Sequence, residues 1–170
     1  AWQALFQSVS AFNNAGFVAL PEGNSLSAFQ HDKVVLGIMG VLIFLGAISY
    51  LVMVDVARFR RFRLFSLNTK LVIVLTAVLT ISGAAVFFTS EQDNPKTLGP
   101  LGLGDKVMVS FFESTSGRTA GFSTVSYGDT AQHTNFFFTS LMFIGGASAS
   151  VAGGIKINTL AVVLVAVLST

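Results

Sequence analysis

Two segments of this 170-residue chain resemble one another and carry the residue types best suited to chemistry. They cover residues 6–17 and 112–122, and each begins with Phe-x-Ser-x-Ser and ends with Ala-Gly-Phe. Glycine adopts backbone conformations that turn carbonyl oxygens toward an axis, and such oxygens can replace the water shell of an ion. The chemistry that this repeat predicts is therefore cation binding by the backbone around Gly16 and Gly121.

A short helix precedes each Ala-Gly-Phe and supports the same interpretation. We expect helices over about 1–12 and 106–116, the second with Asp105 as its N-cap. Eleven residues extend roughly 16 Å, about half the hydrocarbon core of a bilayer. Such a helix can enter a membrane and turn back, and its C-terminal carbonyls favour a cation. The pattern predicts re-entrant loops at 1–20 and 105–125. An ordinary helix ending in a C-capping glycine is the alternative for either copy taken alone.

The rest of the chain has the composition of a membrane protein. Charged residues make up 11%, whereas about 25% is usual in soluble domains. No charged residue lies between Val34 and Val54 or between Leu71 and Ser90. Each run has about the 20 residues that a helix needs to cross a bilayer. We predict transmembrane helices at 33–57 and 70–90, and an all-α polytopic membrane protein.

A basic segment between these two spans sets the expected orientation. It holds five of the ten basic residues, which are Arg58, Arg60, Arg61, Arg63 and Lys70. Short cytoplasmic loops carry an excess of Lys and Arg, so we expect residues 58–70 to be cytoplasmic. The loops at 22–32 and 91–105 are then external. A nucleic-acid patch is the alternative for the arginines, but the flanking spans favour the loop, and no nucleic-acid partner is expected.

The last apolar segment is too long for one membrane helix. From 133 to 169 the only charged residue is Lys156, and a continuous helix would be roughly 55 Å long. Nine of the ten residues from Gly145 to Gly154 are Gly, Ala or Ser. We expect a broken inner helix, with a first part ending near 144 and a second starting near 156. The small residues could pack helices together or form a flexible loop that gates the filter. The excess length favours the gate.

Two basic side chains adjoin these segments. Arg118 precedes the second Ala-Gly-Phe, and a buried Arg needs a partner. Glu113 and Asp129 are the candidate acids, and a structural brace is preferred over a direct role with the ion. Lys156 either pairs with an acid or lipid, or extends its charged end toward the interface.

Enzymatic sites are not supported. The chain contains no cysteine, which excludes disulfides and thiolate metal sites. Both histidines are predicted in external loops, so neither reaches Ser148 or Ser150. The sequence Gly154-Ile155-Lys156 lacks the ending of a phosphate-binding loop. We therefore expect a protein that is not an enzyme.

Three motifs together resemble the Trk/Ktr family of potassium uptake proteins, over essentially the whole chain. They are Phe12-Asn13-Asn14-Ala15-Gly16-Phe17, Arg118-Thr119-Ala120-Gly121-Phe122-Ser123-Thr124, and the stretch from Gly145 to Lys156. The resemblance implies four helix–pore-loop–helix repeats around a pseudo-fourfold pore, each with one filter glycine. On this basis 1–60 is the pore loop and inner helix of one repeat, and 61–170 is most of the next. The chain is then a fragment with two of the four repeats.

The resemblance also implies roles for individual residues. The filter would consist of Asn14, Ala15, Gly16, Thr119, Ala120 and Gly121. Filter support would come from Phe17, Arg118 and Phe122. The gating loop would include Gly145, Gly146, Ser148, Ser150, Gly153, Gly154 and Lys156. The ion would be K⁺, with Na⁺ as a second candidate, held through filter carbonyls only and without a covalently bound cofactor.

The expected setting is the plasma or inner cell membrane. The resemblance implies a lipid bilayer, a second copy in a homodimer and a cytoplasmic nucleotide-binding regulatory subunit as partners. A non-conducting membrane scaffold held together by small-residue packing is the alternative function. Two matched half-helices favour transport, because a scaffold has no need for them. One glycine per repeat does not distinguish selectivity for K⁺ from selectivity for Na⁺. The sequence also does not show whether transport is coupled to Na⁺ or H⁺, or whether the chain belongs to the Trk-like or the Ktr-like branch.

Overall fold

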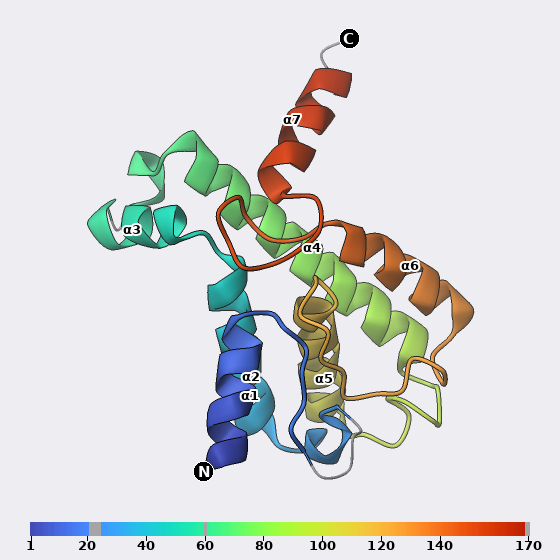
Figure 1. Cartoon of the computed structure of the whole chain (residues 1–170). Helices are drawn as coiled ribbons and strands as arrows, with labels where there is room; N and C mark the ends of the chain where they lie inside the picture. The colour runs from blue at the N-terminus through green and yellow to red at the C-terminus, as the bar shows by residue number, and fades with distance from the viewer. Residues whose placement is uncertain (21–24, 60, 169–170) are drawn as a thin grey trace.

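The chain folds into helices joined by extended loops in a computed structural model that describes residues 1–20, 25–59 and 61–168 (Figure 1). Within these ranges there is no strand beyond one isolated bridge, so the expected all-α class is confirmed. The α-helices are α1 Trp2–Phe12, α2 Lys33–Ala47, α3 Tyr50–Phe59, α4 Leu67–Glu91, α5 Leu103–Ser116, α6 Gln132–Phe143 and α7 Ile157–Leu168, with short 3₁₀ turns at Ser27–Phe29 and Phe62–Leu64.

Helix α4 is the long apolar helix of the molecule. Its 25 residues extend roughly 37 Å, enough to cross a bilayer core. Ser66 caps its start, since its hydroxyl oxygen accepts from the Thr69 amide at 3.3 Å. At its other end Glu91 is fully buried and accepts from the Thr134 hydroxyl at 2.6 Å and the Ala131 amide at 2.9 Å. The end of α4 is therefore tied to the start of α6.

The span expected at 33–57 is two helices rather than one. Helices α2 and α3 meet at 98° across Ile48 and Ser49. Ile48 adopts an extended conformation, and the Ser49 side chain accepts from the Leu51 amide at 3.3 Å, which starts a new helix. A single serine in an apolar run is a weak signal for a break, and so the composition indicates a span without showing the bend.

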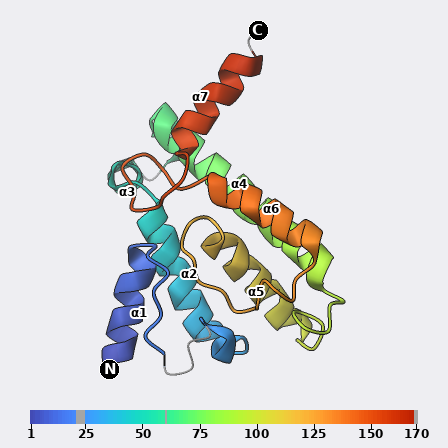
Figure 2. The same ribbon diagram turned by 45° about the vertical axis from the view of Figure 1, so that its right-hand side comes forward.

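Helix α5 is inserted between α2 and α4 (Figure 2). Gly83 of α4 permits the close approach, because a Cβ there would lie 2.3 Å from the Ser114 hydroxyl oxygen. That hydroxyl donates to the Thr80 carbonyl at 2.7 Å, so the two helices are also joined by a hydrogen bond. The expectation that Asp105 is the N-cap is wrong: Gly102 is the cap, and Asp105 lies in the first turn.

Residues 144–156 interrupt the last apolar segment, close to the position predicted for its break. The ends of this interruption lie together, since the Gly145 amide donates to the Ile155 carbonyl at 3.0 Å and the Ile155 amide to the Phe143 carbonyl at 2.9 Å. Compact loops with closely spaced ends are held by their own backbone and side chains. Parts of three predicted segments lie outside the described residues, namely 21–24 of the first external loop, Arg60 of the basic loop and the end of the last helix at 169.

Candidate ion-binding site

The two Ala-Gly-Phe turns lie face to face, although 105 residues separate Gly16 from Gly121. A Cβ added to Gly16 would lie 2.8 Å from the Ala120 carbonyl oxygen and 3.3 Å from the Gly121 Cα. A Cβ on Gly121 would lie 3.4 Å from the Gly16 Cα. The backbones touch where side chains would otherwise stand, so the structure brings the two predicted filter glycines together.

The turns share an unusual backbone conformation. Asn14 and Gly16 have φ of +49° and +72°, and Thr119 and Gly121 have φ of +77° and +82°, whereas Ala15 and Ala120 between them do not have positive φ. Positive φ is uncommon for residues other than glycine and marks a strained position. Alternation between left-handed and ordinary conformations turns successive carbonyls toward one side, which is what a cation needs from a single strand.

A serine at the end of each half-helix holds the turn in place. The Ser10 hydroxyl donates to the Phe17 carbonyl at 2.8 Å, and the Ser116 hydroxyl donates to the Phe122 carbonyl at 2.5 Å. These serines are the second Ser of each Phe-x-Ser-x-Ser. Their role was not predicted, although the repeat itself contains the signal.

The two filter-support phenylalanines have different surroundings. Phe122 is 2% exposed and belongs to the core, as expected for a side chain that packs a strand against the bundle. Phe17 is 70% exposed and does not make the equivalent packing. Among the described residues, helix α1 of the first copy packs mainly against α2. Helix α5 of the second copy packs against both α2 and α4.

Arg118 is buried, and among the described residues it has no acidic partner. It is 5% exposed, and its Nη2 donates to the Gly145 carbonyl at 2.9 Å. Neither candidate acid pairs with it: Asp129 pairs with Lys96 at 3.3 Å, and Glu113 accepts from neutral groups. The guanidinium connects the filter segment to the loop at 144–156, which fits a bracing role.

The loop at 144–156 contacts both the filter segment and the bend after α2 (Figure 1). The Gly153 amide donates to the Thr119 hydroxyl at 3.1 Å. The amides of Ala147 and Val151 donate to the carbonyls of Ala47 at 3.0 Å and Gly46 at 3.3 Å. Those carbonyls lie in the last turn of α2, where they have no partner within the helix. The bend in α2 therefore supplies acceptors for the loop.

Small residues in this loop are required by close backbone contacts and not by helix packing. A Cβ on Gly145 would lie 1.5 Å from the Gly153 carbonyl, and a Cβ on Gly146 would lie 2.6 Å from the Ala47 carbonyl. Gly154 has φ of +70°. The alternative of small-residue packing along a continuous helix is wrong for these residues, because none of them is helical.

The remaining polar groups of the loop mostly find partners nearby. The Ser148 amide donates to the Asn158 side chain at 3.1 Å, and Lys156 donates from Nζ to the Ala152 carbonyl. The Ser150 hydroxyl is buried without a partner in the described part of the chain. Lys156 thus bonds within its own loop, and it pairs with no acid in the part of the chain that the structure describes.

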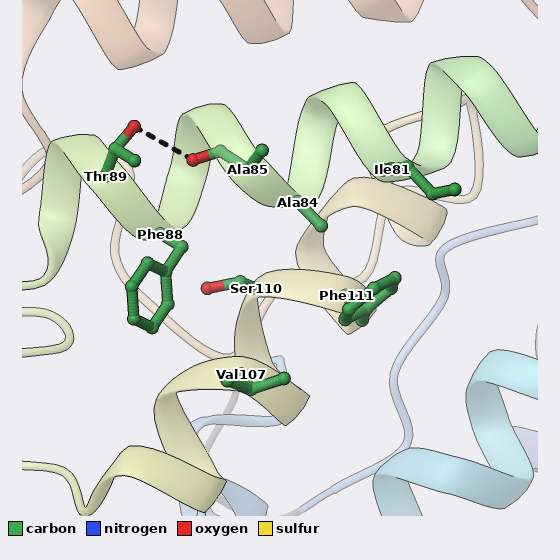
Figure 3. Close-up of a pocket in the computed structure, with 8 residues that line it drawn as sticks. All are labelled: Ile81, Ala84, Ala85, Phe88, Thr89, Val107, Ser110 and Phe111. Carbon is green, nitrogen blue, oxygen red and sulfur yellow. Dashed lines mark hydrogen bonds between the residues drawn. The ribbon is translucent and has the colours of Figure 1, made fainter.

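An apolar groove of about 270 Å³ between α4 and α5 is not an ion site (Figure 3). Its two hydroxyls donate to carbonyls of their own helices, Thr89 to Ala85 at 2.9 Å and Ser110 to Lys106 at 2.7 Å. Across the described residues, no group of three or more His, Cys, Asp or Glu side chains could hold a metal ion. Backbone carbonyls at the paired turns remain the candidate cation ligands.

Comparisons with known proteins agree with this geometry. The family model described as "TrkH: Cation transport protein" matches residues 1–169. Ktr system potassium uptake protein B of Bacillus subtilis (strain 168) is 40% identical over 166 residues, which are 98% of this chain and 37% of that protein. The potassium/sodium uptake protein NtpJ of Enterococcus hirae is 34% identical over 165 residues, which are 96% of this chain and 36% of that protein.

A solved structure supports the fold. The potassium transporter TrkH from Vibrio parahaemolyticus superposes with a TM-score of 0.73 over 96% of this chain and 34% of its own, at 19% sequence identity. This chain spans little more than a third of the length of the curated relatives, at 37% and 36%. The expected helical membrane fold is confirmed by this similarity.

Proposed function

This chain belongs to the TrkH family of cation transport proteins, and from that premise we propose that it forms part of the ion pathway of a potassium uptake transporter. The observation that carries the proposal is the contact between Gly16 and Gly121 in turns with matching φ. Two strands that expose carbonyls at one place can share the coordination of a dehydrated K⁺. In this proposal the pathway contains further strands outside the chain, and Na⁺ is the competing ion.

The loop at 144–156 is proposed as the gate of this pathway. Support comes from its position, since it binds the filter segment at Gly153 and the end of α2 at Ala147 and Val151. A loop held by a few hydrogen bonds can adopt a second arrangement at modest cost, because each bond contributes about 0.5–1.5 kcal/mol. A membrane scaffold would need neither paired turns nor a loop held against them.

The setting of the protein follows from the same proposal. The chain would lie in the cell membrane, with 58–70 cytoplasmic and with 22–32 and 91–105 external, as the basic loop indicates. A second copy of the protein and a cytoplasmic nucleotide-binding regulatory subunit are the proposed partners. The name of the B. subtilis relative, a protein of a Ktr system, is consistent with a transporter that works with other subunits.

Replacement of Gly121 by serine in the full-length protein tests the filter. Serine at φ of +82° is strained, and its Cβ would lie 3.4 Å from the Gly16 Cα. We expect weaker K⁺ uptake affinity and a smaller preference for K⁺ over Na⁺, measured in cells that lack their own potassium uptake. Unchanged affinity and preference in correctly inserted protein would contradict the assignment of Gly121 to the filter.

A further inference from the structure

We propose that Glu113 is a positioning residue for ion selection, whose buried carboxylate fixes the strand that follows Gly121. The inference rests on the proposed function. Glu113 lies on α5 and is 0% exposed. A buried carboxylate is costly unless hydrogen bonds compensate for the lost water, so its partners show what it stabilises.

Three donors from the return strand converge on this carboxylate. The Thr124 amide and hydroxyl donate to Oε1 at 2.6 Å and 2.8 Å, and the Tyr127 hydroxyl donates to Oε2 at 2.9 Å. The Ser123 hydroxyl lies 3.4 Å from Oε1, but it is 2.5 Å from the Val125 carbonyl, which takes its single proton. An ionised carboxylate only accepts, so this set of donors suits its charged form.

The carboxylate and the filter turn are held by the same helix end. Ser116 lies three residues after Glu113, and its carbonyl accepts from the amides of Ala120 at 2.9 Å and Gly121 at 3.3 Å. Its hydroxyl holds the Phe122 carbonyl. Ser116 thus fixes the start and the exit of the turn, and Glu113 holds Thr124 and Tyr127 beyond it. Movement at Thr124 would pass through Phe122 to the Gly121 carbonyl.

Arg118 does not pair with the carboxylate of Glu113. Its Nη2 donates to the Gly145 carbonyl instead, and no ion pair joins these two residues. Among the described residues the carboxylate is therefore surrounded by neutral donors, and in its ionised form it would place a negative charge behind the strand. Such a charge attracts a cation more strongly in a medium of low dielectric than in water. Glu113 would both place the carbonyls and favour their occupation.

The first copy places Gln7 at the position of Glu113. The Ala19 amide donates to Gln7 Oε1 at 3.2 Å, and Ala19 corresponds to Thr124 at a separation of 105 residues. Gln7 Nε2 is buried without a partner among the described residues. The same position of the half-helix thus binds the same position of the return strand in both copies. A repeated contact of this kind points to positioning, and only the second copy adds a charge and two hydroxyls.

The test replaces Glu113 by glutamine in the full-length protein. Glutamine has the same shape and can keep the Thr124 contacts through its oxygen, but its amide group faces Tyr127 and the charge is lost. We expect the K⁺ concentration for half-maximal uptake to rise about tenfold and the preference over Na⁺ to fall, because hydrogen bonds to charged groups are the stronger kind. The maximal rate and the amount in the membrane should stay within about twofold.

Glu91→Gln is the matched control. Glu91 is also 0% exposed and accepts from four neutral donors, but it ties α4 to α6 instead of holding a filter strand. It should lower the amount of protein without changing the K⁺ to Na⁺ preference of what is assembled. Tyr127→Phe removes one donor only and should weaken K⁺ affinity in the same direction as Glu113→Gln, by a smaller factor.

Two results would overturn the inference. One is an unchanged K⁺ affinity and preference in both Glu113→Gln and Tyr127→Phe. The other is the same change in preference with Glu91→Gln, which would make the effect one of general stability. If Gly121→Ser alters selectivity while the Glu113 variant does not, only the role of Glu113 fails. If the unaltered protein takes up no K⁺, the proposed function fails instead.

Discussion

The two Ala-Gly-Phe segments form the same turn in different surroundings. Ala120 is 1% exposed and Phe122 2%, whereas Phe17 in the first copy is 70% exposed. Both turns nevertheless show positive φ at matching positions, Asn14 with Thr119 and Gly16 with Gly121. The conformation therefore depends on local features that the copies share, the glycine and the serine that holds the following carbonyl. What differs is the packing that makes each turn rigid.

The helices that follow the two turns extend the comparison. After the first turn the inner segment bends by 98° across Ile48 and Ser49. After the second, the inner segment is interrupted by 144–156, and the inserted loop binds carbonyls that the first bend exposes. The end of α2 at the first break therefore provides hydrogen-bond acceptors for the loop of the second break. This asymmetry suits the proposed gate, because only the second break is a loop, whereas the first is a bend.

Deletion of 147–152 should have the largest effect, because it removes this asymmetry. It takes away the amides that bind Gly46 and Ala47, and it leaves the Gly145 to Ile155 hydrogen bond that closes the loop. We expect K⁺ flux per assembled protein to rise roughly a hundredfold, within the range of ordinary coupling energies between sites. Control by the cytoplasmic regulator should weaken. Flux is measured in vesicles containing equal amounts of assembled protein.

Loss of assembled protein on this deletion would contradict the gate and indicate a structural role for the loop. The loop lies outside any helix, so the deletion shortens a connection and leaves the helical register of α6 and α7 intact. Loops tolerate insertions and deletions better than the elements that they connect. Correct insertion is therefore the expected outcome, and flux can be compared directly.

Single alanine substitutions at the two filter glycines should have a smaller effect and should differ between the copies. Alanine in a left-handed conformation costs about 1–2 kcal/mol at either position. At Gly16 its Cβ would also lie 2.8 Å from the Ala120 carbonyl, whereas at Gly121 the nearest contact is 3.4 Å. We expect Gly16→Ala to reduce K⁺ affinity more than tenfold and Gly121→Ala several-fold. Uptake titrations with K⁺ and Na⁺ compare the two.

An equal loss at both glycines would show that backbone strain alone governs the filter and that the contact between copies does not. Gly102→Ala is a suitable control, because a Cβ there meets nothing within 4 Å and its φ is not in the left-handed region. That substitution should leave K⁺ affinity unchanged.

Much of the fold was predictable because membrane helices follow from simple patterns. The uncharged runs predicted α4, and the small-residue stretch predicted the break between α6 and α7. The bend at Ser49 was missed because hydropathy shows that a segment is apolar but not whether it is straight. Asp105 was expected to be the N-cap of α5, since the sequence does not show that this carboxylate binds side chains near the start of α2.

The candidate site was predictable as a repeat but not as a set of contacts. Gly16 and Gly121 were identified from Ala-Gly-Phe, and their contact was not, because it depends on how α1, α2 and α5 pack. Arg118 was expected to bind an acid, and it binds a carbonyl of the loop instead. Distance along the sequence does not predict which buried charges meet. Glu113 was considered only as a partner for Arg118, so its hydrogen bonds with Thr124 and Tyr127 were missed.

A substitution at the start of α5 should have the smallest effect, and it tests a further difference between α1 and α5. Asp105 lies in the first turn of α5, 3.0 Å from Lys33 Nζ and 3.1 Å from His31 Nδ1, whereas the first turn of α1 has no acidic residue. Hydrogen bonds from Lys33 and His31 hold the pKa of Asp105 below its ordinary value of 3.8. Because the pKa is lowered in the folded state, the ionised form stabilises the fold above the ordinary pKa, and this stabilisation is lost as pH falls through the folded pKa.

Asp105→Asn should therefore change the melting temperature only slightly at neutral pH and should reduce the loss of stability on acidification below about pH 4. Thermal unfolding in detergent between pH 3 and pH 7 measures both, and an unchanged acid slope in the variant would show that the Asp105 contacts do not stabilise the start of α5.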